Sequence, residues 1–440
     1  MTMLDTPAPA SGVNAARTAK STRYVLVMLF LFYLFNFLDR QIVNILAEPI
    51  KTDLGLADWQ LGAMTGLAFA LFYTVLGIPL ARYADRPTTD RPKLMAVCVV
   101  LWSGMTALCG TATNFIQLML FRIGVGIGEA GCSPAAHSLI SDLVPRERRA
   151  RAMSLYSLGI PLGKLIGMVI GGVVAHTWGW RAAFVLVGLP GVLLGIVAWF
   201  TLRDPRRDMP KPVNVVPPLP LMRVVRDLAP NGALWWVSLA GAFMSFLSYG
   251  QSAFVGSFFI RVHGLNVGEA GVLLGLAFGL AGAVGTWAGG QITDRVAAKH
   301  PRAYVLLPAL AAVGGAALFA FSIMAPTMIA ALLLLACASA LNSSWYGPVF
   351  AVVQSIVRPQ QKATAAAVHL FVVALIGLGL GPLIFGVVSD WLNAQGLGLA
   401  EGLRYALLLA SIPAAMLAVF CFWMASLSVT RHLADGDAHI

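Results

Sequence analysis

Two short stretches of this sequence, ARYADR at residues 81–86 and GQITDR at residues 290–295, share one pattern and each end a long apolar run. In both, a small residue is followed four positions later by Asp-Arg, at Asp85 and at Asp294. The two stretches occupy corresponding places in the first and second halves of the chain. A solvated helix end would explain one such pair but not its recurrence, so we expect two similar halves.

The composition excludes a water-soluble protein. Of the 440 residues, 58% are hydrophobic and only 11% are charged, and the mean hydropathy is +0.80. Soluble domains carry about 25% charged residues. Repeated apolar runs of about 20 residues match helices that cross a hydrocarbon layer of about 30 Å. Because backbone polar groups in lipid must be hydrogen-bonded internally, the runs predict an all-α membrane protein.

The apolar runs predict twelve membrane-spanning helices in two groups of six. The first group covers residues 24–44, 59–82, 94–112, 115–139, 150–175 and 181–202, and the second covers residues 233–260, 268–292, 303–323, 327–352, 363–389 and 403–428. A Pro- and charge-rich connector at residues 203–230 separates them. We expect two pseudo-symmetric six-helix bundles, at residues 21–202 and 231–430. A disordered tail at residues 1–20 and a short tail at residues 431–440 complete the chain.

The distribution of Lys and Arg sets the orientation, because these residues concentrate in cytoplasmic loops. With both termini in the cytoplasm, 23 of the 30 Lys and Arg residues fall in cytoplasmic segments. Four fall on the opposite side, namely Lys51, Arg181, Arg261 and Arg404. The net charge of +11 therefore reflects orientation and attraction to anionic lipid, rather than nucleic-acid binding. We expect a multi-pass protein of the bacterial inner membrane with both termini cytoplasmic.

No pattern for a metal or a nucleotide is present in the sequence. The cysteines are scattered through apolar runs without CxxC spacing, which argues against both disulfides and a metal site. Walker, HExxH and GxSxG motifs are missing, so neither an ATP-driven pump nor a hydrolase is supported. The glycines at residues 124–128 lie within an apolar run and indicate close helix packing rather than a nucleotide loop.

Five ionised side chains lie inside spans of the first half: Asp39, Arg40, Arg122, Glu129 and Lys164. A charge that faces lipid at the bilayer centre costs about 2.5–3.5 kcal/mol, so five would cost roughly 12–18 kcal/mol. They must therefore face one another or a hydrated cavity. The three cations exceed the two carboxylates by one charge, which favours an anionic ligand.

A carboxylate in such a cavity can carry a proton, because burial favours its neutral form and a neighbouring arginine favours its charged form. Arg122 and Glu129 are seven residues apart, which places both on one face of a helix. We hypothesise that Glu129 or Asp39 is protonated in one state and paired with Arg122 in the other. The alternative is a permanent ion pair that only fixes helix packing. No cofactor is expected, and the proton would be the coupling ion.

The second half has polar side chains, but no charge, deep within its predicted spans. An uncharged or aromatic wall opposite a charged one suits an amphiphile with a charged head. A lone histidine on an apolar span is more often a core residue than a ligand. Together with Arg40, Arg122 and Lys164, the candidate ligand contacts are Asn36, Tyr249, Gln251, Asn342, Tyr346 and His369.

Several stretches resemble the spinster-type branch of the major facilitator superfamily. The longest runs from Arg122 through Glu129 to Asp142, and it reads RIGVGIGEAGCSPAAHSLISD. Others are NFLDR at residues 36–40, GIPLG at residues 159–163 and GWRAAF at residues 179–184. The stretches around Asp85 and Asp294 resemble the GxxxDRxGxRR signature of the superfamily. The similarity covers the first half of the chain well and the second half thinly.

The resemblance implies the major facilitator fold and a secondary transporter that works by alternating access. In animal members of the branch the exported substrates are lysolipids or sphingolipid phosphates. Asp39, Arg122 and Glu129 stand at positions thought to couple protons to transport. A charge lock at the cytoplasmic side is also implied, with gating residues Asp85, Arg86, Asp142, Arg149, Asp294 and Arg295.

Three other functions remain open from the sequence. A neighbouring branch of organic-anion/proton symporters has similar Asp-Arg and Arg-to-Glu patterns, so a small organic anion is an alternative substrate. A lipid scramblase or channel is a second alternative. A membrane acyl- or phosphotransferase that uses Glu129 and His137 is a third. We expect a monomer, since the cavity between two bundles needs no partner chain.

Overall fold

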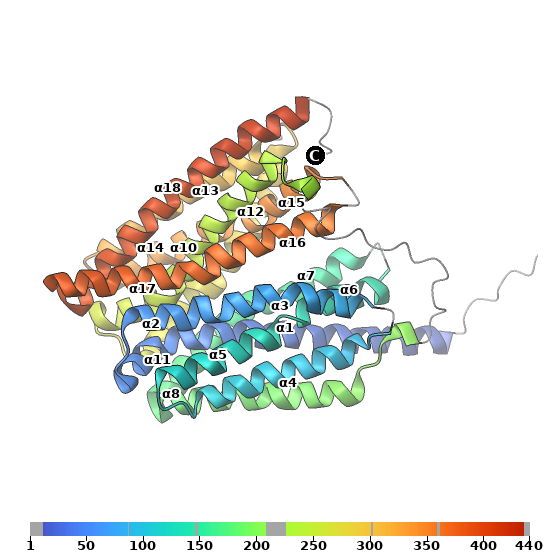
Figure 1. The fold of residues 1–440 in the computed structure, drawn as a ribbon, viewed down its shortest axis with the longest axis horizontal. Coiled ribbons are helices and arrows are strands. Elements are labelled where there is room, and N and C mark those ends of the chain that lie inside the picture. The colour runs from blue at the N-terminus through green and yellow to red at the C-terminus, as the bar shows by residue number, and fades with distance from the viewer. Residues whose placement is uncertain are drawn as a thin grey trace, which may run out of the picture.

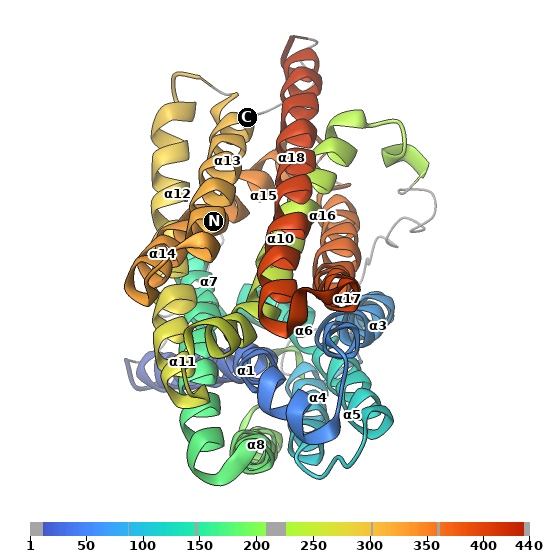
Figure 2. The ribbon, with the colours of Figure 1, turned by 90° about the vertical axis from the view of Figure 1, so that its left-hand side faces the viewer.

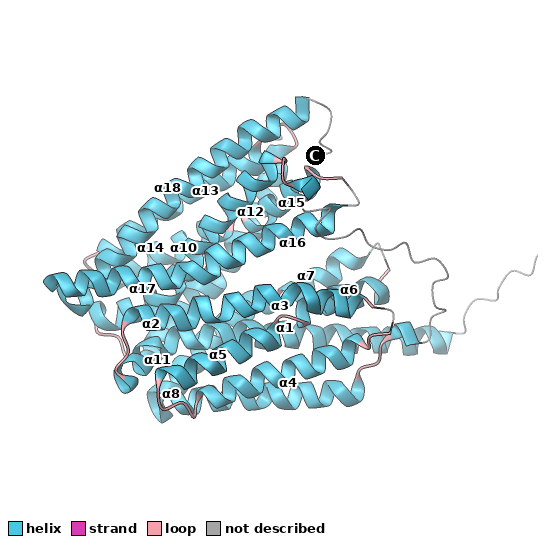
Figure 3. Ribbon diagram, viewed as in Figure 1, coloured by secondary structure: helices cyan, strands magenta, loops and turns pink. Residues whose placement is uncertain are grey.

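The computed structural model of the chain describes residues 12–86, 88–145, 148–207, 226–300, 302–358 and 361–434. Every regular element in these ranges is a helix, as Figure 3 shows by colour. The all-α class expected from the apolar runs is therefore confirmed.

The helices of the first half precede the connector. They are α1 (Gly12–Leu54), α2 (Asp58–Gly62), η1 (Ala63–Leu67), α3 (Ala68–Asp85), α4 (Arg91–Cys109), α5 (Phe115–Glu129), α6 (Cys132–Leu143), α7 (Arg149–Ser157), α8 (Gly159–Thr201) and η3 (Pro205–Arg207). Short polar sequences start several of them. Asn114, for example, caps α5 by accepting a hydrogen bond from the backbone N–H of Gln117.

The helices of the second half follow the connector. They are α10 (Gly232–His263), α11 (Val267–Gly275), η4 (Leu276–Leu280), α12 (Ala281–Ala297), α13 (Ala303–Met324), α14 (Met328–Ser343), α15 (Tyr346–Ser355), α16 (Lys362–Val372), η6 (Val373–Leu380), α17 (Gly381–Leu392), η7 (Asn393–Leu397) and α18 (Gly398–Ala434). The side chain of Asn231 caps α10, and Asn266 forms a capping box with Glu269 at the start of α11.

Ten helical segments of the described chain are long and apolar enough to cross a membrane. Two of them, residues 151–201 and 364–428, have 51 and 65 residues, and each contains a reversal. In α8 the reversal is at Gly179, whose φ of 83° divides two helices. In the second segment it is at Gly396, with a φ of 93°. Glycine adopts these left-handed conformations without the steric cost that a Cβ atom would add.

The helices form two groups that meet at one end of the molecule and diverge at the other (Figure 1). α1–α8 make up one group and α10–α18 the other. Figure 2, seen from the closed end, shows α17 beside α3 and α11 beside α1. Contacts between α2 and α17, α1 and α10, and α8 and α11 join the groups. The start of α1 and the end of α18 both lie at the diverging end (Figure 1).

Close backbone approach holds the α2–α17 contact. A Cβ atom added at Gly62 would lie 2.2 Å from the carbonyl oxygen of Pro382, which is too close for any side chain. Just beyond it, η1 packs against η6. Both are π-helical turns, a form that is rare and often found at functional sites. The sequence predicted regular α-helix at these positions, because apolar periodicity does not distinguish single π-helical turns.

Some predicted boundaries differ from the observed ones. α1 extends from Gly12 to Leu54, so residues 12–20 are helical, whereas the sequence predicts that they belong to a disordered tail. Residues 1–11 and most of the connector, residues 208–225, lie outside the described ranges, as do residues 435–440. The division of the chain into tails, bundles and connector therefore remains a prediction in those parts.

Candidate functional site

A buried ion pair joins α1 to the end of α5. The Nε and Nη2 atoms of Arg40 each lie 2.7 Å from Oε2 of Glu129. The glutamate side chain is completely buried and that of Arg40 is 10% exposed. Arg40 is the cation in direct contact with Glu129, and Arg122 acts on the same carboxylate from further away.

Aromatic rings surround the guanidinium group of Arg40. Its Cζ lies 5.2 Å from the ring centre of Phe37, 4.6 Å from that of Phe69 and 4.8 Å from that of Tyr73. A cation is attracted to the face of an aromatic ring, and more strongly so away from water. These rings stabilise Arg40 at a depth where Glu129 is its ion-pair partner.

Glu129 is not paired with Arg122 in this structure. Because that pairing was expected in only one of two states, it stays a prediction for the other state. Seven residues correspond to about 10 Å along a helix axis, so a shared face does not bring the two groups into contact. Arg122 lies instead over the ring of Phe69, at 5.6 Å. Its Nε and Nη1 atoms are buried without hydrogen-bond partners.

Asp39 points into the first group of helices rather than toward Arg40, because neighbouring helix residues face different directions. The side chain is completely buried, and its neighbouring donors are the indole N–H of Trp102 and the hydroxyl of Thr106. Asn36, which is 3% exposed, lies near Glu129. A carboxylate buried at this depth in a membrane-spanning segment is costly, so this cluster calls for a functional explanation.

Lys164, on the first part of α8, is partly exposed and has no carboxylate partner among the described residues. Arg40 is the charged group that influences it electrostatically. Two cations thus lie near each other, and one of them is already paired with Glu129. The arrangement leaves Lys164 available to an anion.

A small polar pocket lies between the two groups of helices at this depth. It is lined by Arg40, Gln41, Asn44, Thr65, Phe69, Arg122, Tyr249, Leu378 and Pro382. It holds about 10 Å³, roughly the space that one water molecule needs. Beside it, the hydroxyl of Ser252 on α10 donates to Gln41 at 3.1 Å and accepts from Asn44 at 3.2 Å. The pocket is therefore closed toward the end where the helices meet.

The second half contributes fewer of the expected contacts than the sequence suggested. Tyr249 lines the polar pocket, and Tyr346 is 37% exposed. The other three candidates lie inside the second group of helices. Gln251 donates to Ser411 and accepts from Asn342, and His369 is 2% exposed with its Nδ1 3.2 Å from the Ser238 hydroxyl.

In the state described, these three side chains do not line the polar pocket. His369 is a core histidine with a hydrogen-bond partner. This is the more common role of a lone histidine on an apolar span. Asn342 donates to Gln251 at 3.4 Å, so the two amides contact each other inside the second group of helices. Their apolar surroundings in the sequence could not distinguish a cavity wall from a helix–helix contact.

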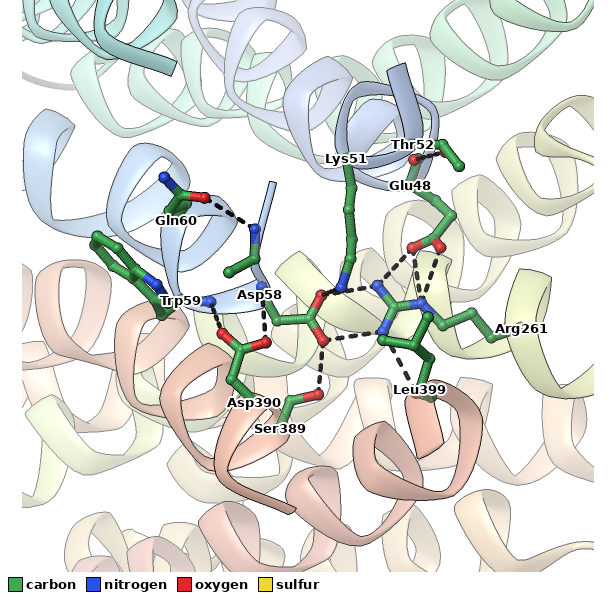
Figure 4. Close-up of polar contacts among 11 residues, drawn as sticks. Glu48, Lys51, Thr52, Asp58, Trp59, Gln60, Arg261, Ser389, Asp390 and Leu399 are labelled. Atoms are coloured by element: carbon green, nitrogen blue, oxygen red, sulfur yellow. Dashed lines mark hydrogen bonds and ion pairs between the residues drawn. The ribbon is translucent and has the colours of Figure 1, made fainter. Parts of the chain in front are cut away.

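A charged network closes the end where the two groups of helices meet (Figure 4). Arg261 of α10 lies 2.8 Å from Asp58 of α2 and 2.7 Å from Glu48 of α1. Lys51 lies 2.6 Å from the same Asp58 carboxylate, and Ser389 of α17 donates to it at 2.7 Å. Asp58 and Arg261 are 1% and 6% exposed, so the pairs are largely screened from water. We call these five residues the end clamp.

The end clamp is extended by a helix cap that crosses between the groups. Both carboxylate oxygens of Asp390 on α17 accept hydrogen bonds from the first backbone N–H groups of α2, at Asp58 and Trp59, over 3.0 and 2.7 Å. Figure 4 shows these bonds beside the arginine pairs. A carboxylate at a helix N-terminus satisfies free N–H groups and interacts favourably with the helix dipole. The two groups cannot separate here without losing both sets of contacts.

At the diverging end, a second network lies within the first group of helices. Arg91, which is completely buried, contacts both oxygens of Asp204 at 2.9 and 2.6 Å, and it also contacts Asp142 at 2.7 Å. Arg206 lies 2.8 Å from Asp142. Burial alone raises the pKa of Asp204, but the hydrogen bonds from Arg91 outweigh it and hold that pKa below its ordinary value.

Of the predicted gating residues that the structure describes, Asp142 is the one that belongs to this network. Arg149 donates to the carbonyl of Val144, and Asp294 accepts from the hydroxyl of Tyr304 at 3.1 Å. Arg86 stacks on Tyr83, and Arg295 is exposed. The side chain of Asp85 lies outside what the structure describes. The proposed charge lock therefore remains a prediction for another state.

Sequence reasoning missed both networks. Lys51 and Arg261 were counted as ordinary loop cations, and Asp58 lies at the start of a span where an acidic residue is common. Only their convergence across the two halves distinguishes them. Among the residues that the structure describes, no three His, Cys, Asp or Glu side chains are grouped as a metal site would require.

Comparisons with known proteins agree with this architecture. The chain is 35% identical to an MFS-type efflux pump of Mycolicibacterium smegmatis over 91% of both chains. It is 26% identical to a hexuronate transporter of Bacillus subtilis, over 83% of this chain and 87% of that one.

Among solved structures, the chain is similar to a bacterial homologue of the human lysosomal transporter Spinster in an inward-facing, unoccupied conformation. The TM-score is 0.85 and the identity 31%, over 96% of this chain and 99% of that one. These relatives are transporters and not enzymes. The family model for the Major Facilitator Superfamily matches residues 29–382, and the chain belongs to this family as a spinster-like, multi-pass membrane transporter.

Proposed function

We propose that this protein is a proton-coupled secondary transporter of an anionic amphiphile in the bacterial inner membrane. The reversals at Gly179 and Gly396 support twelve crossings, and the Lys and Arg distribution supports cytoplasmic termini. With that orientation the end clamp is periplasmic, and the state described is open toward the cytoplasm. In alternating access, the periplasmic end would open while the cytoplasmic end closes, so that the central charges face each side in turn.

The observation that carries the proposal is the buried pair of Arg40 and Glu129 beside the unpaired Lys164. An anion that binds Lys164 also competes with Glu129 for Arg40. A buried carboxylate that loses its cation is stabilised by taking up a proton. Binding of the anion and of a proton would therefore be coupled. Asp39 and Arg122 are the further coupling groups, since they are buried and incompletely paired near Glu129.

The substrate head is expected to contact Arg40 and Lys164, with Tyr249 and Tyr346 opposite. An anionic amphiphile suits one charged and one aromatic wall. A small organic anion is the second candidate. It is supported by the similarity to a hexuronate transporter and by the polar lining of the small pocket beside Arg40. A thermal-shift screen of lysophospholipids, sphingoid phosphates and small organic anions distinguishes them, because a ligand of the folded state raises the Tm.

Glu129→Gln in proteoliposomes tests the coupling. We expect loss of substrate accumulation driven by a pH gradient, by at least about tenfold, while counterflow between equal pools continues. Glu401→Gln is the matched control, since Glu401 is 41% exposed and pairs with Arg404 one turn away. Full proton-driven accumulation by Glu129→Gln would contradict the carrier role of this carboxylate.

A further inference from the structure

A groove runs along the outer surface of the first group of helices, between the start of α4 and the end of α8. Both helices lie on the side away from the second group (Figure 1, Figure 2). The groove has a volume of about 500 Å³, within the range of about 300–1,000 Å³ that ligand sites occupy. Its walls are apolar and aromatic, and they come from Val97, Val100, Leu101, Ile196, Trp199 and Phe200. It shares no residue with the polar pocket between the two groups.

Small residues form the floor of the groove. Ala96 is 1% exposed, and Gly195 is buried. A Cβ atom added at Gly195 would lie 3.0 Å from the carbonyl oxygen of Ala96 and 2.7 Å from Cγ2 of Val100. On the walls, Val97 is 52% exposed and Phe200 is 79% exposed. The groove is therefore a depression between two closely packed helices, and it is open on the face that meets the lipid.

Aromatic side chains mark the level at which the groove begins. Trp199 is 40% exposed near the end of α8, and the hydroxyl of Tyr24 lies 2.7 Å from that of Thr201. Trp and Tyr gather at the membrane–water interface, where an amphipathic ring is most stable. From this level the groove follows α4 from residue 96 to residue 101, which is about 7.5 Å toward the bilayer centre. An alkyl chain can enter it from the interface.

Two cations lie at the interfacial end of the groove. Nζ of Lys93 is 5.0 Å from the ring centre of Trp199, which places the ammonium group beside the groove wall. Arg203 is exposed, and the residue after it, Asp204, accepts a hydrogen bond from the backbone N–H of Arg91 at 3.0 Å. That bond holds this segment against the first turn of α4. Within the part of the chain that the structure describes, neither Lys93 nor Arg203 forms an ion pair.

The carboxylates at this end are already engaged. Asp90 caps α4 by accepting a hydrogen bond from the backbone N–H of Lys93 at 3.2 Å, and Asp204 is paired with the buried Arg91. The end of the groove is therefore left with a positive charge from Lys93 and Arg203. Basic sites between helices on the cytoplasmic side of a membrane attract anionic lipid head groups. An apolar groove below two free cations suits one molecule that carries both an alkyl chain and a phosphate.

We propose that this groove binds an anionic phospholipid, with one acyl chain between α4 and α8 and the phosphate at Lys93 and Arg203. The leaflet is the cytoplasmic one in the orientation proposed above. The lipid site lies outside the polar pocket, so it does not depend on which substrate is transported. Phosphatidylglycerol carries one net negative charge, whereas the choline cation of phosphatidylcholine balances its phosphate. The site should therefore prefer phosphatidylglycerol.

Native mass spectrometry of the purified full-length chain tests this preference. The protein is titrated in detergent with dioleoylphosphatidylglycerol or with dioleoylphosphatidylcholine, which have the same acyl chains, and the fraction with one bound lipid is measured. We expect the first phosphatidylglycerol to bind at least about tenfold more tightly, because two basic residues face its head group. Equal affinities for the two lipids would overturn the proposal.

Charge variants assign the preference to this site. Lys93→Gln combined with Arg203→Gln should bring the two lipids to within about threefold of each other. Lys299→Gln combined with Arg302→Gln is the control, since it removes two exposed cations between α12 and α13 in the second group of helices. The control should keep the full preference. A preference that survived in the Lys93 and Arg203 variant would contradict the assignment of the phosphate.

A variant that fills the groove tests the position of the acyl chain. Ile196 is a wall residue that is 43% exposed, and Ile196→Trp should weaken phosphatidylglycerol binding by at least about fivefold, because the chain loses buried contact. Leu193→Trp is the matched control, since Leu193 lies one turn earlier on α8, is 63% exposed and does not line the groove. Unchanged binding in Ile196→Trp would mean that the chain lies elsewhere, and the groove would not be the lipid site.

Discussion

Arg40 is the residue on which most contacts of the central site converge. Two of its nitrogens bind Glu129, and its planar guanidinium group lies among the rings of Phe37, Phe69 and Tyr73. Lysine keeps the charge but has neither the planar fork nor the stacking face, so the exchange is not conservative at such a site. The geometry of this one side chain thus links the carboxylate, the aromatic rings and the ligand.

Arg40→Lys is therefore expected to reduce transport by at least about tenfold while the protein still folds. Initial rates of counterflow in proteoliposomes measure the effect, and the elution profile and Tm report on folding. Arg404→Lys serves as the control, because Arg404 is 25% exposed and pairs with Glu401 on its own helix. If Arg40→Lys transported at the normal rate, the two guanidinium contacts with Glu129 and the stacking on the aromatic rings would not be needed for transport.

Asp204 gives a prediction about pH. Its pKa in the folded protein lies below its ordinary value, so ionised Asp204 stabilises the fold above the unfolded-state pKa of about 3.9. The contribution is lost as the pH falls through the lower, folded-state pKa. Asp204→Asn should cost about 3 kcal/mol at pH 7, since it leaves the buried Arg91 undercompensated. The difference in Tm from the unmodified protein should shrink below about pH 4.

Thermal unfolding in one detergent between pH 7 and pH 3 measures this convergence. Asp53→Asn provides a comparison, because Asp53 pairs with Arg181 where both side chains are more than 40% exposed, at 44% and 43%. Exposed pairs contribute little to stability, so its Tm should change little at any pH. A Tm difference for Asp204→Asn that stayed constant down to pH 3 would contradict the role given to the ionised carboxylate.

At the scale of elements, the contact between α2 and α17 depends on close approach of two backbones. A Cβ atom at Gly62 would meet the carbonyl oxygen of Pro382 at 2.2 Å and the Cα of Leu383 at 2.8 Å. These are backbone atoms, which cannot rotate away. The neighbouring cap from Asp390 to α2 requires the same spacing. The closed end is therefore sensitive to a single methyl group.

Gly62→Ala should push α2 from α17 and lower the Tm of this conformation by several degrees, because overpacking typically costs about 1–3 kcal/mol. Gly77→Ala on α3 is the matched control, since no atom lies within 4 Å of its added Cβ. There we expect no loss, because alanine favours a helix over glycine by about 0.8–1.0 kcal/mol. Equal Tm values for the two variants would show that the α2–α17 contact can relax.

At the scale of the whole molecule, the sequence predicted the arrangement of spans better than the contacts between them. The length of an apolar run is set by the thickness of the bilayer, so spans such as 115–139 and 303–323 lie within a few residues of the helices. The first span is an exception, because its helix continues past residue 44 to Leu54. The cost of charges in lipid likewise predicted that Arg40, Glu129 and Lys164 would converge. Both expectations follow from the properties of the lipid bilayer and not from the details of helix packing.

Choices among partners could not be predicted in the same way. Helical spacing placed Arg122 and Glu129 on one face, but which cation reaches Glu129 depends on how α1 crosses α5. Arg261 and Asp58 are more than two hundred positions apart, and the sequence around each of them is not unusual. They form a pair because the two halves of the chain meet. Such contacts depend on tertiary geometry that no local pattern contains.

The end clamp gives a prediction for the balance between the two open states. Removing Arg261 would leave the buried Asp58 with Lys51 as its one remaining cation and Glu48 without its arginine. Breaking a buried pair in this way costs about 3–5 kcal/mol, and about 3 kcal/mol is a factor of more than 100 between two states. Arg261→Gln should therefore favour the conformation in which this end opens and the end that carries the termini closes.

Pulsed electron paramagnetic resonance between spin labels at Arg151 of α7 and at Lys299, just after α12, measures the shift, with the exposed Cys337 replaced by serine. Both positions are exposed at the diverging end, so their distance should shorten in Arg261→Gln. Arg181→Gln removes an exposed pair within the first group of helices and should leave the distance unchanged. An unaltered distance distribution in Arg261→Gln would mean that the backbone contacts of α2 with α17, rather than the charges, hold this end closed.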